Sequence, residues 1–290
     1  MNLDSFSATL EKEFVSLKEK NMSEYTNTAG QRLDLPEPVV SLSGRTMGGA
    51  DYQIIGTVMQ ALTLRMKPGM GFYTEVGSLS WMSQGVRMDT NLGKGGLMGA
   101  LGRMFTGESL FVVNYTAEID GAMATFSCDF PGKIVPVNLA QGQAMIAQKD
   151  TLLVAEQSVS LSIAFQKRLG AGLFGGEGFI LQKFEGPGTF FASFDGEIVE
   201  YTLQPGQKML VDTGHLAMFE PTVTYDVQMV KGVKNLLFGG EGLFLVSLTG
   251  PGRIWLQTMP MSKLAGAIHK FMPSAEGKSQ GPGLNINLGG

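Results

Sequence analysis

Apolar and polar residues alternate with a period of two in short segments along most of the chain. Leu62, Leu64 and Met66, for example, alternate with polar neighbours. This is the pattern of a strand that has one face on a core and the other in water. The segment ends at Pro68-Gly69, where Pro fixes φ and Gly allows the positive φ of a tight reversal. The pattern predicts many short β-strands joined by turns.

Two sequence signatures recur along the chain with a similar spacing. One is a Gly-Glu turn, which occurs three times at nearly equal intervals: Gly107-Glu108, Gly176-Glu177 and Gly240-Glu241. The other is the turn glycine that ends an alternating segment: Gly69, Gly142 and Gly206. After these glycines the chain aligns without a gap, which matches Phe72 with Met145 and Met209, Leu79 with Leu152 and Leu216, and Val86 with Val159 and Val223. Two signatures that share one period predict three copies of one supersecondary unit.

Strands are expected at equivalent places in each copy. One follows each Gly-Glu turn, at 111–115, 179–183 and 243–248, and another follows the next Gly-rich reversal, at 189–194 and 253–258. Six or seven short strands per copy are too many for one flat sheet, so each copy is expected to roll up as a small sandwich or double-stranded β-helix. The predicted fold class is all-β, with pseudo-threefold internal repeats.

The remaining segments set the domain boundaries. Residues 3–20 carry an apolar helical stripe and residues 21–50 lack periodicity, so residues 1–50 are expected to form an amphipathic helix and a linker arm. The triplicated domain is predicted over residues 51–272, and its parts are repeats at 51–130, 131–195 and 196–260 and a closing helix at 262–271. Residues 273–290 are rich in Gly and Pro and are expected to form a flexible tail.

Composition narrows the classes of function. A net charge of −4 and a pI near 5.3 disfavour a nucleic-acid footprint, which needs a basic surface. Cys128 is the single cysteine, so no intrachain disulfide can form, and a cytoplasmic location is expected. No stretch resembles a secretion signal or a long apolar membrane span.

Motifs of enzyme chemistry are weak or are contradicted by their context. Residues 170–175 fit the spacing GxGxxG, but a strand is expected after them where a dinucleotide site needs a helix. His215, His269 and Cys128 are too few for a zinc site. Asp212 lies near His215, but no nucleophile motif accompanies the pair. No catalytic residue, metal ligand or cofactor is therefore predicted, and the question of an enzyme stays open with the balance against one.

The three repeated carboxylates Glu108, Glu177 and Glu241 have two interpretations. They could converge on a hard cation such as calcium near a threefold axis. The favoured interpretation is that each carboxylate accepts backbone N–H groups within its own turn.

Basic and apolar residues gather before each Gly-Glu turn. The residues concerned are Lys94, Leu97, Met98 and Arg103 in the first copy, Lys167, Arg168, Leu173 and Phe174 in the second, and Lys231, Lys234, Leu237 and Phe238 in the third. Such loops could enter a bilayer interface while their cations meet anionic headgroups. Burial between neighbouring units of an oligomer is the favoured alternative, because the apolar residues recur in all copies.

The repeat period, the GGEG and PGQ turns, and the segment WLQTMP at 255–260 together resemble the altered inheritance of mitochondria protein 24 family. The resemblance covers about residues 52–272. It implies a triplicated, shortened double-stranded β-helix similar to the subunit of the tryptophan RNA-binding attenuation protein, and association of three chains into a ring of nine units. Mitochondrial members of the family are linked to inner-membrane organisation. The family supplies no catalytic residue.

Three functions are therefore compared. The first is a homotrimeric β scaffold that acts by binding or assembly. The second is a peripheral membrane protein that uses the basic and apolar loops, and the third is a metal- or small-molecule-dependent enzyme with a cleft between repeats. RNA binding is disfavoured by the acidic balance of the chain.

Overall fold

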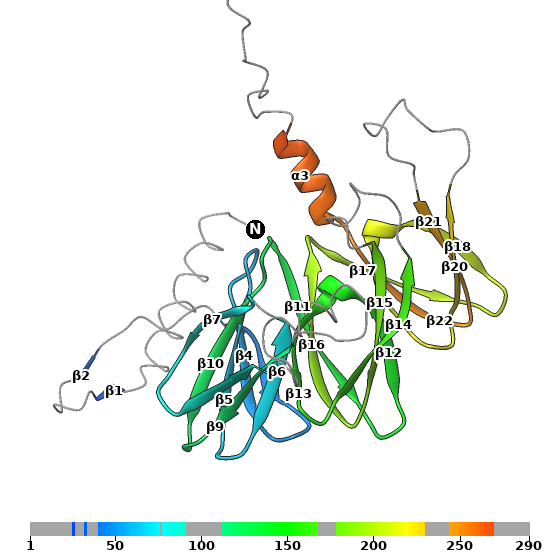
Figure 1. Cartoon of the computed structure of the whole chain (residues 1–290). Coiled ribbons are helices and arrows are strands. Elements are labelled where there is room, and N and C mark those ends of the chain that lie inside the picture. The colour runs from blue at the N-terminus through cyan, green and yellow to red at the C-terminus, as the bar shows by residue number, and fades with distance from the viewer. Residues whose placement is uncertain are drawn as a thin grey trace, which may run out of the picture. The chain divides into compact units, whose positions relative to one another are not determined.

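The computed structural model of the chain describes residues 25–26, 32–33, 40–75, 77–90, 112–167, 178–229 and 244–269. Within these ranges the chain consists mainly of β-strands joined by tight turns (Figure 1). Antiparallel pairing dominates, with one isolated parallel bridge between Met59 and Gly132. The predicted all-β class is confirmed.

The chain divides into two compact units whose sequence ranges interleave. The first comprises Met1–Ala140, Leu153–Val159 and Pro187–Ala192, and the second comprises Gln141–Leu152, Ser160–Gly186 and Ser193–Gly290. Each unit draws on more than one of the three segments proposed as repeats. The repeat boundaries therefore stay a prediction.

The first unit contains most of two sheets. A five-stranded sheet has the order β3-β4-β5-β10-β7, and a six-stranded sheet has the order β11-β16-β13-β6-β9-β8. Their strands are β3 (Val40–Arg45), β4 (Asp51–Ile55), β5 (Ala61–Met66), β6 (Gly71–Glu75), β7 (Leu79–Met82), β8 (Val86–Thr90), β9 (Val112–Ala117), β10 (Ala122–Ser127), β11 (Gly132–Leu139), β13 (Leu152–Glu156) and β16 (Gly188–Asp195). A separate pair is formed by β1 (Tyr25–Thr26) and β2 (Arg32–Leu33).

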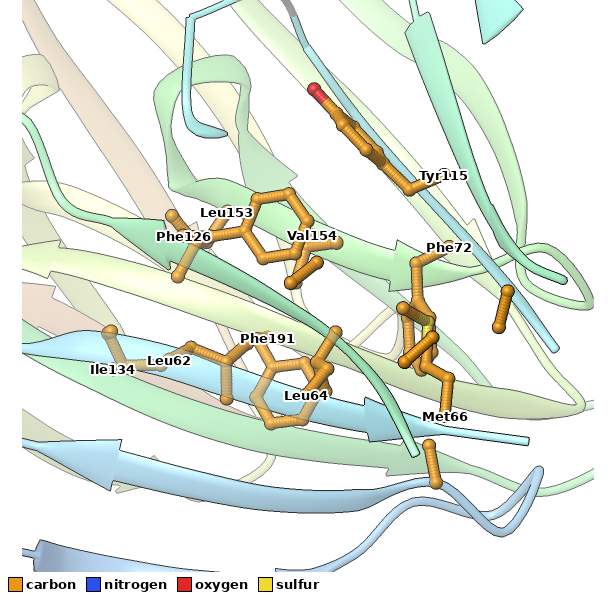
Figure 2. Close-up of a cluster of buried hydrophobic side chains, with 14 of the residues drawn as sticks. Leu62, Leu64, Met66, Phe72, Tyr115, Phe126, Ile134, Leu153, Val154 and Phe191 are labelled. Atoms are coloured by element: carbon orange, nitrogen blue, oxygen red, sulfur yellow. The ribbon is translucent and has the colours of Figure 1, made fainter. Parts of the chain in front are cut away.

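The core of the first unit lies between these two sheets. Leu62 and Leu64 of β5 point toward side chains of the other sheet, among them Val154 of β13 and Phe191 of β16 (Figure 2). Phe126 of β10 completes this layer and packs edge to face against Tyr115, with ring centroids 5.2 Å apart. One face of each sheet therefore lines a shared apolar interior.

The second unit has the same two-layer construction. Its sheets have the orders β14-β15-β12-β19-β22-β17 and β18-β21-β20, and apolar residues of both, such as Phe219 and Val246, share one core. Its elements are β12 (Ala144–Gln148), η1 (Lys149–Thr151), β14 (Ser160–Lys167), β15 (Phe179–Glu185), β17 (Ile198–Leu203), β18 (Lys208–Asp212), η3 (Thr213–His215), β19 (Leu216–Phe219), β20 (Thr224–Met229), β21 (Phe244–Thr249), β22 (Gly252–Gln257) and α3 (Met261–His269).

Several local predictions agree with the structure. The turn glycines Gly69, Gly142 and Gly206 have φ of +83°, +80° and +77°, the left-handed conformation that favours glycine. The strands expected at 179–183 and 253–258 correspond to β15 and β22, and the predicted closing helix corresponds to α3.

Two predictions need correction. Thr63, expected on the solvent face of β5, is buried, and its hydroxyl forms a 2.9 Å hydrogen bond with the hydroxyl of Thr125 on β10. The linker arm assigned to residues 21–50 overlaps β3, which pairs with β4 along its length. Thr63 is buried because β5 pairs with β10, 62 residues later in the sequence at this point, and local periodicity does not show that pairing. The strand β3 pairs with β4 in a local hairpin, with Arg45 opposite Asp51.

Candidate functional site

Most of the residues singled out from the sequence lie outside the described residues. This applies to the three Gly-Glu turns and to all of the basic and apolar loop residues except Lys167. The ammonium group of Lys167, at the end of β14, donates a 3.0 Å hydrogen bond to the carbonyl of Val227 on β20. Whether the repeated carboxylates bind a cation, and what the loops contact, remain predictions.

The candidate catalytic residues do not form a triad in the described part of the chain. The carboxylate of Asp212 accepts a 2.9 Å hydrogen bond from the backbone N–H of Gly214, so it caps the η3 turn. The Nδ1 atom of His215 lies 2.7 Å from the carbonyl oxygen of Gln257. No cluster of three or more His, Cys, Asp or Glu side chains suited to a metal ion occurs among the described residues. Cys128 is half-buried, and the pairing of Asp212 and His215 is a local turn arrangement.

The feature that stands out instead is a pair of open sheet edges. In the six-stranded sheet of the first unit, β6 is joined to β13, with Tyr73 opposite Ala155. In the six-stranded sheet of the second unit, β12 is joined to β19 in the same antiparallel way, with Ile146 opposite Phe219. The open edges are β7 and β18. In the described part of the chain, β7 is an outermost strand of the five-stranded sheet, and β18 is an outermost strand of the three-stranded sheet.

Burial distinguishes the joined strands from the open ones. Every residue of β13 and β19 is buried. In contrast, β7 exposes 50% of Trp81 and 40% of Met82, and β18 exposes 63% of Leu210. Large apolar side chains on an unpaired edge are an association hazard unless another strand covers them. The two edges therefore have the composition of interface strands.

The exposed residues occupy positions equivalent to the buried junctions. When the three copies are aligned on their turn glycines, Leu210 occupies the position of Tyr73 and Ile146. In the same alignment, Met82 occupies the position of Ala155 and Phe219. The exposed Leu210 and Met82 thus align in sequence with residues that are buried at the two observed junctions.

A second recurrent feature is a side chain that accepts a hydrogen bond from a distant strand. The Oε2 atom of Glu156 accepts from the N–H of Thr189 at 2.7 Å. The Oε2 atom of Glu220 accepts from the N–H of Arg253 at 2.9 Å, and the Oγ atom of Ser83 accepts from the N–H of Met123 at 2.9 Å. Ser83, Glu156 and Glu220 occupy one and the same position in the alignment of the three copies.

The two carboxylate versions share further detail. The glycine before the donor, Gly188 or Gly252, has a φ of +143° in both cases. A side chain on Gly188 would approach the Val159 methyl carbon Cγ2 to 2.7 Å, and one on Gly252 would approach Val223 equally closely. Glycine is therefore required at both places, where one strand passes directly over the turn of another.

Glu156 also holds the turn between β3 and β4. Its side chain is buried, and its Oε1 atom accepts a 2.8 Å hydrogen bond from the N–H of Gly48. The neighbouring N–H of Met47 donates to the hydroxyl of Thr189 at 2.9 Å. In the second unit, the equivalent Glu220 instead accepts from the guanidinium of Arg253, with a nitrogen to oxygen distance of 2.8 Å. A buried carboxylate that receives two backbone N–H groups is a structural clamp.

Sequence reasoning identified neither the open edges nor the Glu156 clamp. The signal for the edges was the alignment on Gly69, Gly142 and Gly206, which matches Leu210 with Tyr73 and Ile146, and Met82 with Ala155 and Phe219. The signal for the clamp was the repeat alignment itself, which matches Glu156 with Glu220.

The described chain is thus an antiparallel β protein with recurrent strand-crossing turns and two apolar edges, and it shows no assembled catalytic group. It belongs to the family described as mitochondrial biogenesis AIM24, whose model matches residues 52–259. An uncharacterized protein of Streptococcus pyogenes serotype M6 is 29% identical over 217 residues, which cover 72% of this chain and 86% of that protein. A crystal structure of a protein from Streptococcus pyogenes has a TM-score of 0.64 at 24% identity and covers 79% of this chain and 100% of that chain. The latter likeness supports the fold alone.

The described residues contain no helix with the length and hydropathy needed to cross a bilayer.

Proposed function

We propose that the chain is a non-catalytic scaffold built from three copies of one β unit, and that it assembles head to tail through β7 of one copy of the chain and β18 of the next. The observation that carries the proposal is the exposure of apolar residues on these two edges at positions whose equivalents are buried. A closed head-to-tail ring pairs every such edge, and the family resemblance implies that the ring is a homotrimer.

The first step of the argument is the repeat. The order of strands is the same from β5 to β10, from β11 to β16 and from β17 to β22. Each set contributes three strands to one sheet and three to another: β5-β10-β7 and β6-β9-β8 in the first set, β11-β16-β13 and β12-β15-β14 in the second, and β17-β22-β19 and β18-β21-β20 in the third. The recurrent acceptors at Ser83, Glu156 and Glu220 support the same division.

The second step is the way in which the sets join. The strands β6 and β13 connect the first set to the second, and β12 and β19 connect the second to the third. Each set therefore pairs with the next set through one edge strand and with the previous set through a different edge strand. A chain of three sets must leave one edge of each kind unpaired, and these edges are β7 and β18.

The third step is association between chains. A head-to-tail interface uses two different surfaces and forms a ring when the rotation closes. Backbone hydrogen bonds between edge strands would supply part of the affinity, and the burial of Trp81, Met82 and Leu210 would supply an apolar centre. A single cysteine fits a reducing location such as the cytoplasm.

Disulfide cross-linking tests the proposed register. In a Cys128→Ser background, Met82→Cys and Leu210→Cys are combined and the protein is oxidised under mild conditions. Directly opposed residues of antiparallel strands have Cα atoms about 4.5–5.5 Å apart, which suits a disulfide. The expected product is a covalent species of three chains that persists in SDS and is lost on reduction.

The control moves one cysteine by two positions along the same strand. Ser80→Cys with Leu210→Cys places the Cα atoms about 7–8 Å apart, beyond the usual disulfide range. This pair should cross-link much more slowly. Equal cross-linking of both pairs, or no intermolecular product from the first, would refute the proposed interface.

A further inference from the structure

The helix α3 presents an apolar stripe that the rest of the described chain leaves largely exposed. Met261, Leu264, Ala265 and Ile268 follow the spacing i, i+3, i+4 and i+7, which places them on one side of a helix. Met261 is 44% exposed and Ile268 is 54% exposed. Leu264 is half-buried and Ala265 is exposed.

The beginning of α3 is fixed, and its remaining turns are not covered by the described part of the chain. The carboxylate of Asp195 accepts a 3.1 Å hydrogen bond from the N–H of Met261, the first residue of the helix. The carbonyl of the buried Pro260 accepts hydrogen bonds from Lys263 and Leu264. A helix of nine residues is marginal in water by itself, because nucleation is costly and its apolar side remains hydrated. Cover on the apolar stripe would therefore stabilise α3.

The charges in and around α3 indicate which kind of partner covers its apolar stripe. The chain has an overall charge of −4, yet no Asp or Glu occurs from Gly242 to Ala275. Lys263 lies within α3, and Lys270 follows directly after it in the sequence. The carboxylate of Asp195 is bound to the helix N-terminus, and that of Asp212, beside Pro260, accepts a hydrogen bond from the N–H of Gly214. A locally cationic, apolar helix in an acidic protein is complementary to an anionic lipid surface.

The length of α3 defines its mode of binding. Nine residues at 1.5 Å per residue give about 13 Å, less than half of the roughly 30 Å hydrocarbon core of a bilayer. Such a helix cannot span a membrane, but it can lie in the interface with its apolar side in the acyl region. Lys263 is exposed and lies on the opposite side from Ile268, from which it can reach the headgroups.

We propose that α3 is a docking element for an anionic bilayer surface, with Met261, Leu264 and Ile268 entering the interface and Lys263 contacting the headgroups. The helix shares no residue with the two open edges. It also differs from the basic and apolar loops that the sequence suggested, which lie outside the described residues.

Vesicle flotation with the full-length chain tests this inference. The vesicles are phosphatidylcholine with one quarter phosphatidylglycerol, or phosphatidylcholine alone. The wild-type protein is expected to float with the anionic vesicles and much less with the neutral ones. The double variant Met261→Glu/Ile268→Glu should lower the partition coefficient by about tenfold or more, because two apolar groups become repelled anions. Lys263→Glu should lower it by about tenfold on anionic vesicles only.

A matched control and a second readout keep the test decisive. Ile119→Glu changes an apolar residue of the first unit that is 52% exposed and lies outside α3, and it should leave flotation unchanged. Thermal unfolding confirms that the variants are folded, and light scattering without lipid gives their mass. The proposal is overturned if the wild type does not float with anionic vesicles, or if the double variant floats as well as the wild type. A change in lipid-free mass caused by the double variant would also overturn it, because α3 would then bind a second copy of the chain.

Discussion

The clamp made by Glu156 allows a graded prediction of stability. Its two oxygens accept hydrogen bonds from the N–H groups of Gly48 and Thr189 at 2.8 and 2.7 Å, and only 5% of the residue is exposed. Hydrogen bonds to a charged group contribute about 1.5–3 kcal/mol each, and their loss leaves buried donors unpaired. Glu156→Ala should therefore destabilise the first unit by about 3–5 kcal/mol, after allowance for partial entry of water.

The equivalent positions provide internal references. Ser83→Ala removes a neutral hydrogen bond from the N–H of Met123 and an exposed one to the carbonyl of Gln84, and should cost about 1 kcal/mol. Glu220→Ala removes a more exposed carboxylate, whose side chain is 27% exposed, and should cost about 1–2 kcal/mol. Glu156→Gln keeps the shape of the side chain but directs an amide N–H₂ at a backbone donor. The stability that it costs should therefore lie between the costs of Glu156→Ala and Glu220→Ala.

Urea unfolding can follow the two units separately. Trp81 lies in the first unit and Trp255 in the second, so single-tryptophan variants report on each one. Glu156→Ala should shift the Trp81 transition to lower urea, whereas Glu220→Ala should shift the Trp255 transition. The reasoning is refuted if Glu156→Ala costs no more than Ser83→Ala, or if its effect appears only in the Trp255 transition.

Three further predictions concern packing and ionisation. Gly188→Ala and Gly252→Ala should each destabilise the protein by about 2 kcal/mol or more in urea titrations, because a Cβ would meet neighbouring atoms at 2.5–2.7 Å. Burial raises the pKa of Tyr73, whose hydroxyl donates a hydrogen bond to the carbonyl of Val159. The stability that Tyr73 adds over Tyr73→Phe should be constant below about pH 10 and decrease above it, as the unfolded tyrosine ionises first; a constant difference from about pH 8 to 11.5 would contradict this. Thr63→Val should cost about 1–2 kcal/mol by leaving the buried Thr125 hydroxyl unpaired, and the double variant with Thr125→Val should recover part of that loss; purely additive effects would exclude the coupling.

The sequence was a good guide to features that local chemistry decides. Pro-Gly at 68–69 implied a reversal, and Gly69 has the positive φ that such a turn needs. The helix before Pro273 was also predictable, because an apolar period of about 3.6 residues is a property of one short segment.

The remaining features depend on partners far along the chain. Glutamate is a residue type usually found at the surface. Glu156 is buried because the N–H groups of Gly48, 108 residues earlier, and Thr189, 33 residues later, donate hydrogen bonds to its carboxylate. Sheet order decides that β13 is buried while β7 is open, and sheet order is not encoded in any single strand.

The mass of the protein in solution tests the central claim most directly. Light scattering coupled to gel filtration should give about 93 kDa for the wild type, three times the chain mass of 31.1 kDa. Leu210→Asp, which places a charge on the β18 edge, should give 31.1 kDa, whereas Val58→Asp, at an equally exposed apolar position on a turn, should leave the mass unchanged. A wild-type protein that elutes as a single chain at micromolar concentration, or a trimer that Leu210→Asp leaves intact, would contradict assembly through these edges.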